Sequence, residues 1–205
     1  MPIEILYAIP MGLTLSFSAG PVFFVVIQTS IQHGKMRATL FDLGAVTADI
    51  IYILLAFYSS QKFLLNLRDN VYVAVISGIA VIIFGAYYFR KSSVGGQFKN
   101  QYDSARRRVF YLKGFLLNFF NIGVLFYWIT TTIAIGSLLN HDQKHMKVFY
   151  TATLITYMVI DAFKIYFANK LQKRLSGRTI QLVEKILGIV LMAFGAFVIV
   201  RGLLL

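Results

Sequence analysis

The sequence contains no cysteine and few acidic residues, with eight Asp and Glu against twenty Lys and Arg. The absence of cysteine excludes disulfides, thiolate metal sites and thiol redox chemistry, and we expect no cofactor and no resident metal. The net charge of +12 does not indicate nucleic-acid binding. The basic residues lie in short segments between apolar runs, where they set membrane orientation and meet anionic lipid headgroups.

Apolar residues dominate the 205-residue chain, at 58% of the total and a mean hydropathy of +0.71. A soluble domain is roughly 45–50% apolar even with glycine counted, so the composition predicts a membrane protein. A spanning helix needs about 20 mainly apolar residues. The sequence supplies six such runs, over residues 5–28, 39–60, 71–89, 109–136, 147–169 and 181–203.

The first and fourth runs resemble each other, because Gly12–Ile27 aligns with Gly114–Ile129. Each run is interrupted near its middle, and the interruptions Ala19-Gly20-Pro21 and Asn121-Ile122-Gly123 coincide. A second similarity relates residues 76–86 to residues 186–196. The chain is therefore predicted to consist of two related halves, and paired broken helices are typical of a transport site between repeats.

The loop charges predict the orientation. Twelve Lys and Arg follow the first, third and fifth runs, whereas five lie on the alternate side, so both termini are predicted to lie outside. Each half has three spans, an odd number, and the second half must therefore be inverted relative to the first. We predict an all-α membrane protein of six transmembrane helices in two inverted three-helix repeats, with helices 1 and 4 broken. The repeats are residues 1–91 and 109–205, and residues 92–108 form a basic cytoplasmic linker.

The two interruptions are the candidate substrate site. Pro21 lacks a backbone donor, and Gly20 beside it weakens the helix further, so carbonyl groups are released from the helical ladder. Such groups are tolerated at membrane depth only inside protein or around water. A zwitterionic solute could place its ammonium on these carbonyls and its carboxylate on half-helix N-termini. The candidate substrate-binding residues are Ser18, Gly20, Pro21, Asn118, Asn121 and Gly123.

Two aspartates lie inside predicted spans, Asp49 in the second and Asp161 in the fifth. Charged groups at this depth are costly and usually mark an ion path or a substrate contact, so both are candidate proton carriers. Lys164 lies one turn after Asp161 and either simply neutralises it or joins a proton relay. Asp42, nearer the cytoplasmic rim, is expected to cap the helix or to pair with Lys35 or Arg37.

Small and titratable residues elsewhere have plainer interpretations. Four glycines spaced by seven in the third and sixth runs indicate close helix packing, within one chain or between the subunits of a homo-oligomer; they are Gly78, Gly85, Gly188 and Gly195. His141, Asp142 and His145 are expected in a loop as solvated side chains.

These motifs resemble the lysine exporter (LysE/RhtB) superfamily of six-helix efflux proteins, over nearly the whole chain. Ala19-Gly20-Pro21 is similar to its Pro-Gly-Pro motif, the stretch from Gly34 to Asp49 to its spaced glycines ending in Gly-Asp, and Gly114–Asn121 to the start of its second half. Ala19, Ala48 and Ile122-Gly123 depart from the family pattern. The resemblance implies export of amino acids, driven by the proton motive force, across a bacterial inner membrane.

The sequence therefore predicts a secondary-active exporter of an amino-acid-like small solute, not an enzyme. Divalent-metal export is the main alternative, because carboxylates and asparagine oxygens suit hard cations. An intramembrane aspartic protease would need two aspartates that share a proton, but the residues before Asp49 lack the expected Gly-x-Gly pattern. A non-transporting scaffold would have a dry core with no cavity beside Asp49.

Overall fold

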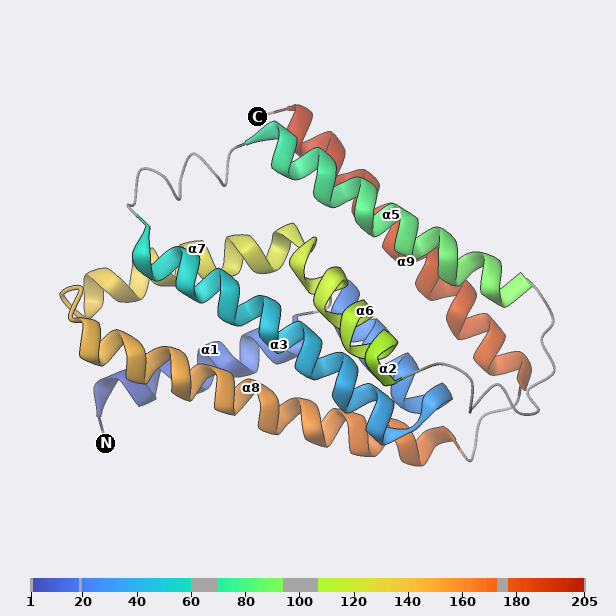
Figure 1. Cartoon of the computed structure of the whole chain (residues 1–205), viewed down its shortest axis with the longest axis horizontal. Coiled ribbons are helices and arrows are strands. Elements are labelled where there is room, and N and C mark those ends of the chain that lie inside the picture. Colours follow the sequence, from blue (N-terminus) through green and yellow to red (C-terminus); the bar gives the residue numbers. More distant parts are fainter. Residues whose placement is uncertain (1, 19, 60–69, 94–106, 173–176, 205) are drawn as a thin grey trace.

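The chain folds into helices throughout the part that its computed structural model describes, residues 2–18, 20–59, 70–93, 107–172 and 177–204. The eight helices of these ranges are shown in Figure 1: α1 (Ile3–Phe17), α2 (Pro21–His33), α3 (Lys35–Tyr58), α5 (Val71–Ser93), α6 (Arg107–Phe119), α7 (Ile122–Leu138), α8 (Gln143–Gln172) and α9 (Gly177–Leu203). The all-α prediction is confirmed for these ranges. Ala19 and most of the predicted linker, residues 94–106, lie outside them.

Two pairs of helices are sharply bent. The axes of α1 and α2 differ by 68°, and those of α6 and α7 by 62°. Pro21 is the first residue of α2, a position where its missing N–H costs no hydrogen bond. The second break lies at Phe120 and Asn121.

One detail of the second break was predicted wrongly. Gly123 is not part of the interruption but belongs to the first turn of α7. The side chain of Asn121 accepts a hydrogen bond from the N–H of Gly123 at 3.2 Å. An asparagine N-cap, rather than a flexible glycine, therefore sets where α7 begins.

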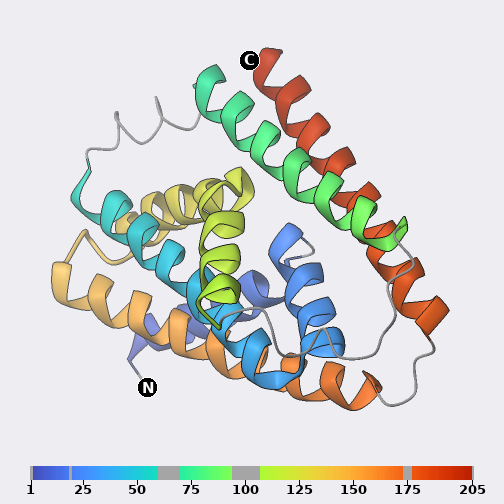
Figure 2. The same ribbon diagram turned by 45° about the vertical axis from the view of Figure 1, so that its right-hand side comes forward.

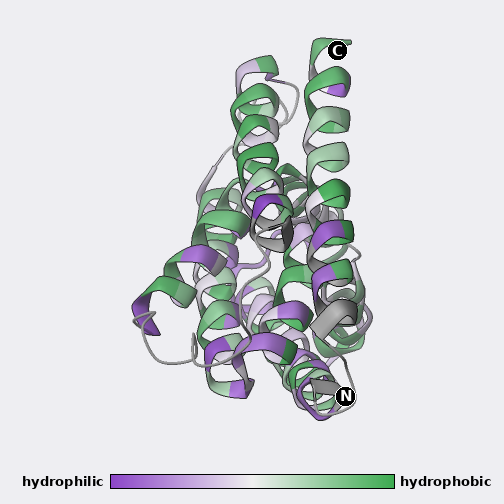
Figure 3. Ribbon diagram, turned by 90° about the vertical axis from the view of Figure 1, so that its right-hand side faces the viewer, coloured by the Kyte–Doolittle hydropathy of each residue, from purple (hydrophilic) through white to green (hydrophobic). Residues whose placement is uncertain are grey.

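The helices have the length and exposure of membrane spans. Three of them, in α3, α8 and α9, are long and apolar enough to cross a bilayer, and counting each bent pair as one span gives up to five. A shorter apolar helix covers Val71–Tyr87 in α5. Large apolar side chains face outward, such as Ile83, Phe167 and Phe197, each more than 60% exposed, and apolar residues predominate along most helices in Figure 3. The chain is a multi-pass membrane protein.

The densest packing joins α5 to α9, α3 to α6 and α1 to α8. Helices α5 and α9 run side by side along one flank (Figures 1 and 2). They are antiparallel, because a Cβ added to Gly78 would meet Gly195 and one added to Gly85 would meet Gly188. The glycine stripe therefore packs within one chain, as one of its two interpretations predicted.

The other two pairs are parallel. Along α1 and α8 the contacts advance together, from Glu4 with His145 to Ser16 with Asp161. Glycines allow the close approach in both pairs: a Cβ on Gly12 would lie 2.7 Å from the carbonyl oxygen of Thr153, and one on Gly114 would lie 1.8 Å from that of Phe41. Gly12 and Gly114 are the aligned glycines of the repeat. The two halves thus use the same contact.

The buried apolar side chains form two main clusters. One joins α1, α3, α7 and α8 around Trp128 and Phe149. The other joins α2, α3, α6 and α9, with single residues from α5 and α8, around Phe41 and Leu117. The helix breaks and the buried carboxylates lie where these two clusters meet.

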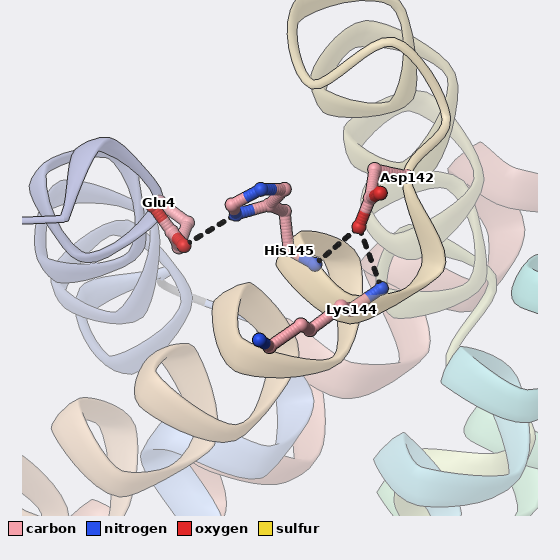
Figure 4. Close-up of polar contacts among 4 residues, drawn as sticks. All are labelled: Glu4, Asp142, Lys144 and His145. Atoms are coloured by element: carbon pink, nitrogen blue, oxygen red, sulfur yellow. Dashed lines mark hydrogen bonds and ion pairs between the residues drawn. The ribbon is translucent and has the colours of Figure 1, made fainter.

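Polar contacts fix the beginning of α8 (Figure 4). Asp142 Oδ1 accepts hydrogen bonds from the N–H groups of Lys144 at 2.8 Å and His145 at 3.0 Å. The N–H of His145 in particular holds the pKa of Asp142 below its usual value. His145 Nδ1 lies 2.6 Å from Glu4 Oε1. The side chain of His145 is half exposed, as expected for a solvated residue, but the expectation that it lies in a loop was wrong, because it belongs to the first turn of α8. The contact with Glu4 joins the first turns of α1 and α8.

We expect Gly114→Ala to lower the free energy of unfolding by about 1–3 kcal/mol, the usual cost of overpacking, because its methyl group would collide with the backbone of Phe41. Gly20→Ala is the matched control, since its Cβ would come no closer than 3.5 Å to another heavy atom. Thermal unfolding of both variants in detergent measures the difference. Equal melting temperatures for the two variants would contradict the close approach of α3 and α6.

Candidate functional site

A small cavity of about 30 Å³ lies between the two helix breaks. By volume it has room for one or two water molecules. Seven of the residues predicted from the sequence line it, Ser18, Gly20, Asp49, Asn118, Asn121, Asp161 and Lys164. The remaining lining residues are Leu15, Ser16, Val22, Phe23, Val124 and Tyr157. The cavity therefore collects side chains from both halves of the chain.

Asp161 is held by contacts from α1 and from its own helix. Ser16 Oγ donates a hydrogen bond to Asp161 Oδ1 at 2.5 Å, and Lys164 Nζ lies 2.7 Å from the same oxygen. Lys164 Nζ also donates to the carbonyl oxygen of Ser16 at 2.5 Å. That carbonyl belongs to the last turn of α1, where the helix break leaves it without its usual helical partner. Lys164 thus binds both a carboxylate and a released backbone carbonyl.

Asp49 is completely buried between α3, α6 and α7. Trp128 Nε1 donates a hydrogen bond to Asp49 Oδ1 at 2.8 Å. Asn118 lines the same cavity as Asp49, and its side chain donates to the carbonyl oxygen of Ala45 at 2.8 Å. The carboxyl group of Asp49 in the first half therefore accepts a hydrogen bond from the second half of the chain.

The surroundings of the two aspartates correspond to each other. Asn118 aligns with Ser16 in the repeat; Ser16 contacts Asp161, and Asn118 lines the same cavity as Asp49. Tyr52 follows Asp49 by one turn, as Lys164 follows Asp161. The hydroxyl of Tyr52 donates to the carbonyl of Phe119, the last residue of α6. Each broken helix end therefore receives a hydrogen bond from the residue one turn after an aspartate, a tyrosine in one half and a lysine in the other.

Asp42 is a candidate functional residue that the sequence reasoning missed. It was expected to pair with Lys35 or Arg37 near the rim, but only 5% of it is exposed. Tyr157 Oη donates to Asp42 Oδ1 at 3.3 Å, and Asp161 lies near enough to interact electrostatically with the carboxyl group of Asp42. The signal was present in the spacing, because positions seven residues apart lie on the same face of a helix, and Asp42 stands seven residues before Asp49.

Two predicted substrate-binding residues, Pro21 and Gly123, are absent from the cavity lining. Pro21 is buried and Gly123 is exposed. Their effect on the site is through the backbone, since both lie in the first turns of the helices that begin at the breaks.

The two helix N-termini at the cavity are not equivalent. Asn121 caps α7 with its side chain, whereas Gly20 gives α2 no side-chain cap. The first-turn N–H groups of a helix have no partner inside it, so those of Val22 and Phe23, both residues that line the cavity, are candidate donors to an anion. Within the described ranges, no group of three or more His, Asp or Glu side chains is placed to hold a metal ion.

Two comparisons find similar proteins. Residues 13–202 match the family described as LysE type translocator. A protein of Bacillus subtilis (strain 168) named "Putative amino acid efflux protein YcgF" is 21% identical over 197 residues, which cover 95% of this chain and 94% of the relative. No solved structure matches the chain.

The family match extends from the middle of α1 to the last turn of α9 and so includes both helix breaks and every residue of the cavity. The chain therefore belongs to the LysE type translocator family.

Proposed function

We propose that the protein is a secondary-active exporter of a small amino-acid-like solute, coupled to inward proton movement across a bacterial inner membrane. The observation that carries this proposal is the shared cavity, which both helix breaks and two buried aspartates line. Family membership and the printed name of the Bacillus relative support the amino-acid class of the solute.

The cavity offers separate partners for the two ends of a zwitterion. On one side are Asp161 and the released carbonyl of Ser16, which suit an ammonium group. On another are the uncapped N–H groups at the start of α2, which suit a carboxylate because the helix dipole adds to their attraction. Asn118 and Asn121 add neutral hydrogen-bonding groups from the second half.

The buried carboxyl groups provide proton sites. Three aspartates, Asp42, Asp49 and Asp161, lie around one lysine. Each of these carboxyl groups can carry a proton, which removes its negative charge. Binding and release of such a proton would change the charge of the site and so couple the proton gradient to the solute.

The packing supports the proposed inverted repeats. In the proposed repeats α1 corresponds to α6, α3 to α8 and α5 to α9. Exchange of the corresponding helices turns the α1 contact with α8 into the α6 contact with α3, and the contact between α5 and α9 stays the same. In a chain that crosses the membrane six times, spans one and five run in the same direction, as do two and four, whereas three and six are opposed. These are the relative directions of α1 and α8, of α3 and α6, and of α5 and α9.

The small volume of the cavity supports alternating access. A site of about 30 Å³ cannot enclose an amino acid together with its contacts, so the solute must enter by separation of the surrounding helices. The two breaks are natural places for that movement, because half-helices joined by two or three residues can rotate without breaking their own hydrogen-bond ladders.

The alternative functions have less support. Divalent-metal export has little support because, among the described residues, no three His, Asp or Glu side chains are grouped to hold a metal ion. An aspartic protease would need Asp49 and Asp161 to share a proton, but Asp49 binds Trp128 while Asp161 binds Ser16 and Lys164. A scaffold with no cavity beside Asp49 does not fit the cavity that Asp49 lines.

The proposed topology is testable with single cysteines, because the chain has none of its own. We expect a membrane-impermeant maleimide to label Lys144→Cys in intact cells, since the loop before α8 is placed outside. Lys35→Cys should react only after the membrane is permeabilised. Both residues are exposed at the surface of the protein. Labelling of both positions from the same side would contradict the inverted arrangement.

We expect Asp49→Asn to abolish proton-driven export in proteoliposomes while the protein remains folded. Asparagine keeps the size of the side chain and can still accept from Trp128, but it cannot carry a proton. Flux of amino acids, supplied singly against an imposed pH gradient, is the measurement.

Asp142→Asn is the matched control for this experiment. The substitution also replaces a carboxylate with an amide, but at the helix cap outside the cavity, where asparagine caps as well as aspartate. Its flux should equal that of the wild type. Unchanged flux in Asp49→Asn would remove Asp49 from the mechanism, and flux of Mn²⁺ without flux of any amino acid would favour metal export instead.

A further inference from the structure

We propose that the ammonium group of Lys164 occupies the subsite that receives the ammonium group of a solute, and that a solute binds there by displacing Lys164. The inference rests on the proposed function, because it assigns the chemistry of one end of the same site. It identifies the ligand class of this subsite as primary amines, and it gives Lys164 the role of a built-in competitor.

The contacts of Lys164 are those that a free primary ammonium group would make. Its Nζ lies 2.7 Å from Asp161 Oδ1 and 2.5 Å from the carbonyl oxygen of Ser16. It also lies 4.9 Å from the ring centre of Phe23 and 5.9 Å from that of Phe17, within the range of cation–π attraction. A carboxylate, a released carbonyl and aromatic faces together form a site for a cation that has several N–H donors.

The lysine is free to leave this position. Its ammonium group ends a flexible four-carbon chain with three rotatable donors, and its side chain is 11% exposed at the edge of the cavity. The helix break itself does not require a cation at residue 164. The corresponding residue of the other half is Tyr52, whose neutral hydroxyl donates to the carbonyl of Phe119 at the second break. The positive charge of Lys164 therefore balances the negative charge of Asp161.

Exchange of one ammonium group for another preserves the charge balance of the site. Addition of a second cation beside Lys164 would place like charges together in a poorly solvated region, whereas removal of the lysine alone would leave Asp161 without its partner, which is strongly unfavourable. Replacement of the lysine by the amine of a solute avoids both costs. The site is thus occupied by one cation at each stage of the exchange.

The test uses n-propylammonium, a primary amine without a carboxylate, and measures its affinity from the rise in melting temperature of the purified protein. Lys164→Met should bind it at least about tenfold more tightly than the wild type does, the factor expected if the lysine fills the subsite about nine-tenths of the time. Tetramethylammonium has the same charge but no N–H to donate, and it should show a much smaller gain.

Three control variants separate competition from other effects. Lys170→Met removes an exposed lysine of the same helix and should keep the wild-type affinity. The double variant Lys164→Met with Asp161→Asn lacks the carboxylate that contacts Lys164 and should not gain affinity. Tyr52→Phe removes the equivalent side-chain donor to the other helix break and should not gain affinity for n-propylammonium either. Loss of a hydrogen bond to a helix break would then not explain the gain in Lys164→Met.

Equal or weaker binding of n-propylammonium by folded Lys164→Met would overturn the proposal. If Lys164→Met does not fold alone, the test is repeated with Lys164→Gln and with purification in the presence of n-propylammonium, because a free amine should take the place of the lysine. Failure to fold even under these conditions also contradicts the proposal. Wild-type export of amino acids without the affinity gain would refute this inference alone. The affinity gain without any amino-acid export would refute the proposed function alone.

Discussion

The structure depends on the hydrogen bonding of peptide groups at two broken helices. Inside an apolar bundle these groups have no water to bind, and an unpaired one is costly. The protein supplies one side-chain donor to the end of each first half-helix, from Lys164 to Ser16 and from Tyr52 to Phe119. Each donor is placed one turn after a buried aspartate. The buried polar side chains provide hydrogen bonds to the peptide groups at the breaks, and the same side chains are then available to a solute.

Two matching glycine contacts explain why the polar groups meet. Glycines at equivalent positions bring α1 against α8 and α6 against α3, and this close packing carries Ser16 to Asp161 and Asn118 into the cavity that Asp49 lines. The side chains around Asp161 differ from those around Asp49. Around Asp161 the cavity is lined by Lys164 and Ser16, and around Asp49 by Asn118, whereas Trp128 and Tyr52 act from outside the lining through hydrogen bonds to Asp49 and to the carbonyl of Phe119.

Much of the site was predictable because it follows from rules that act along the chain. Proline and glycine in an apolar run predict a break, and an aspartate at membrane depth predicts an interior polar site; seven predicted residues line the cavity. The seven-residue spacing places Asp42 on the same face of α3 as Asp49, but local sequence could not identify the partners of Asp42, since nearby Lys35 and Arg37 offered a surface partner. Packing against α8 gave it Tyr157 and Asp161 instead, which required contacts over more than a hundred residues.

The sequence by itself determined that the chain is a helical membrane protein with helix breaks at matching positions, and it predicted two related halves. It could do so because hydropathy, proline and glycine act on neighbouring residues. Only the tertiary structure decided which carboxylates lie together, that Asn121 rather than Gly123 begins α7, and that His145 binds Glu4. Those outcomes depend on which helices approach closely, and that approach is set by the glycine contacts between segments distant in the chain.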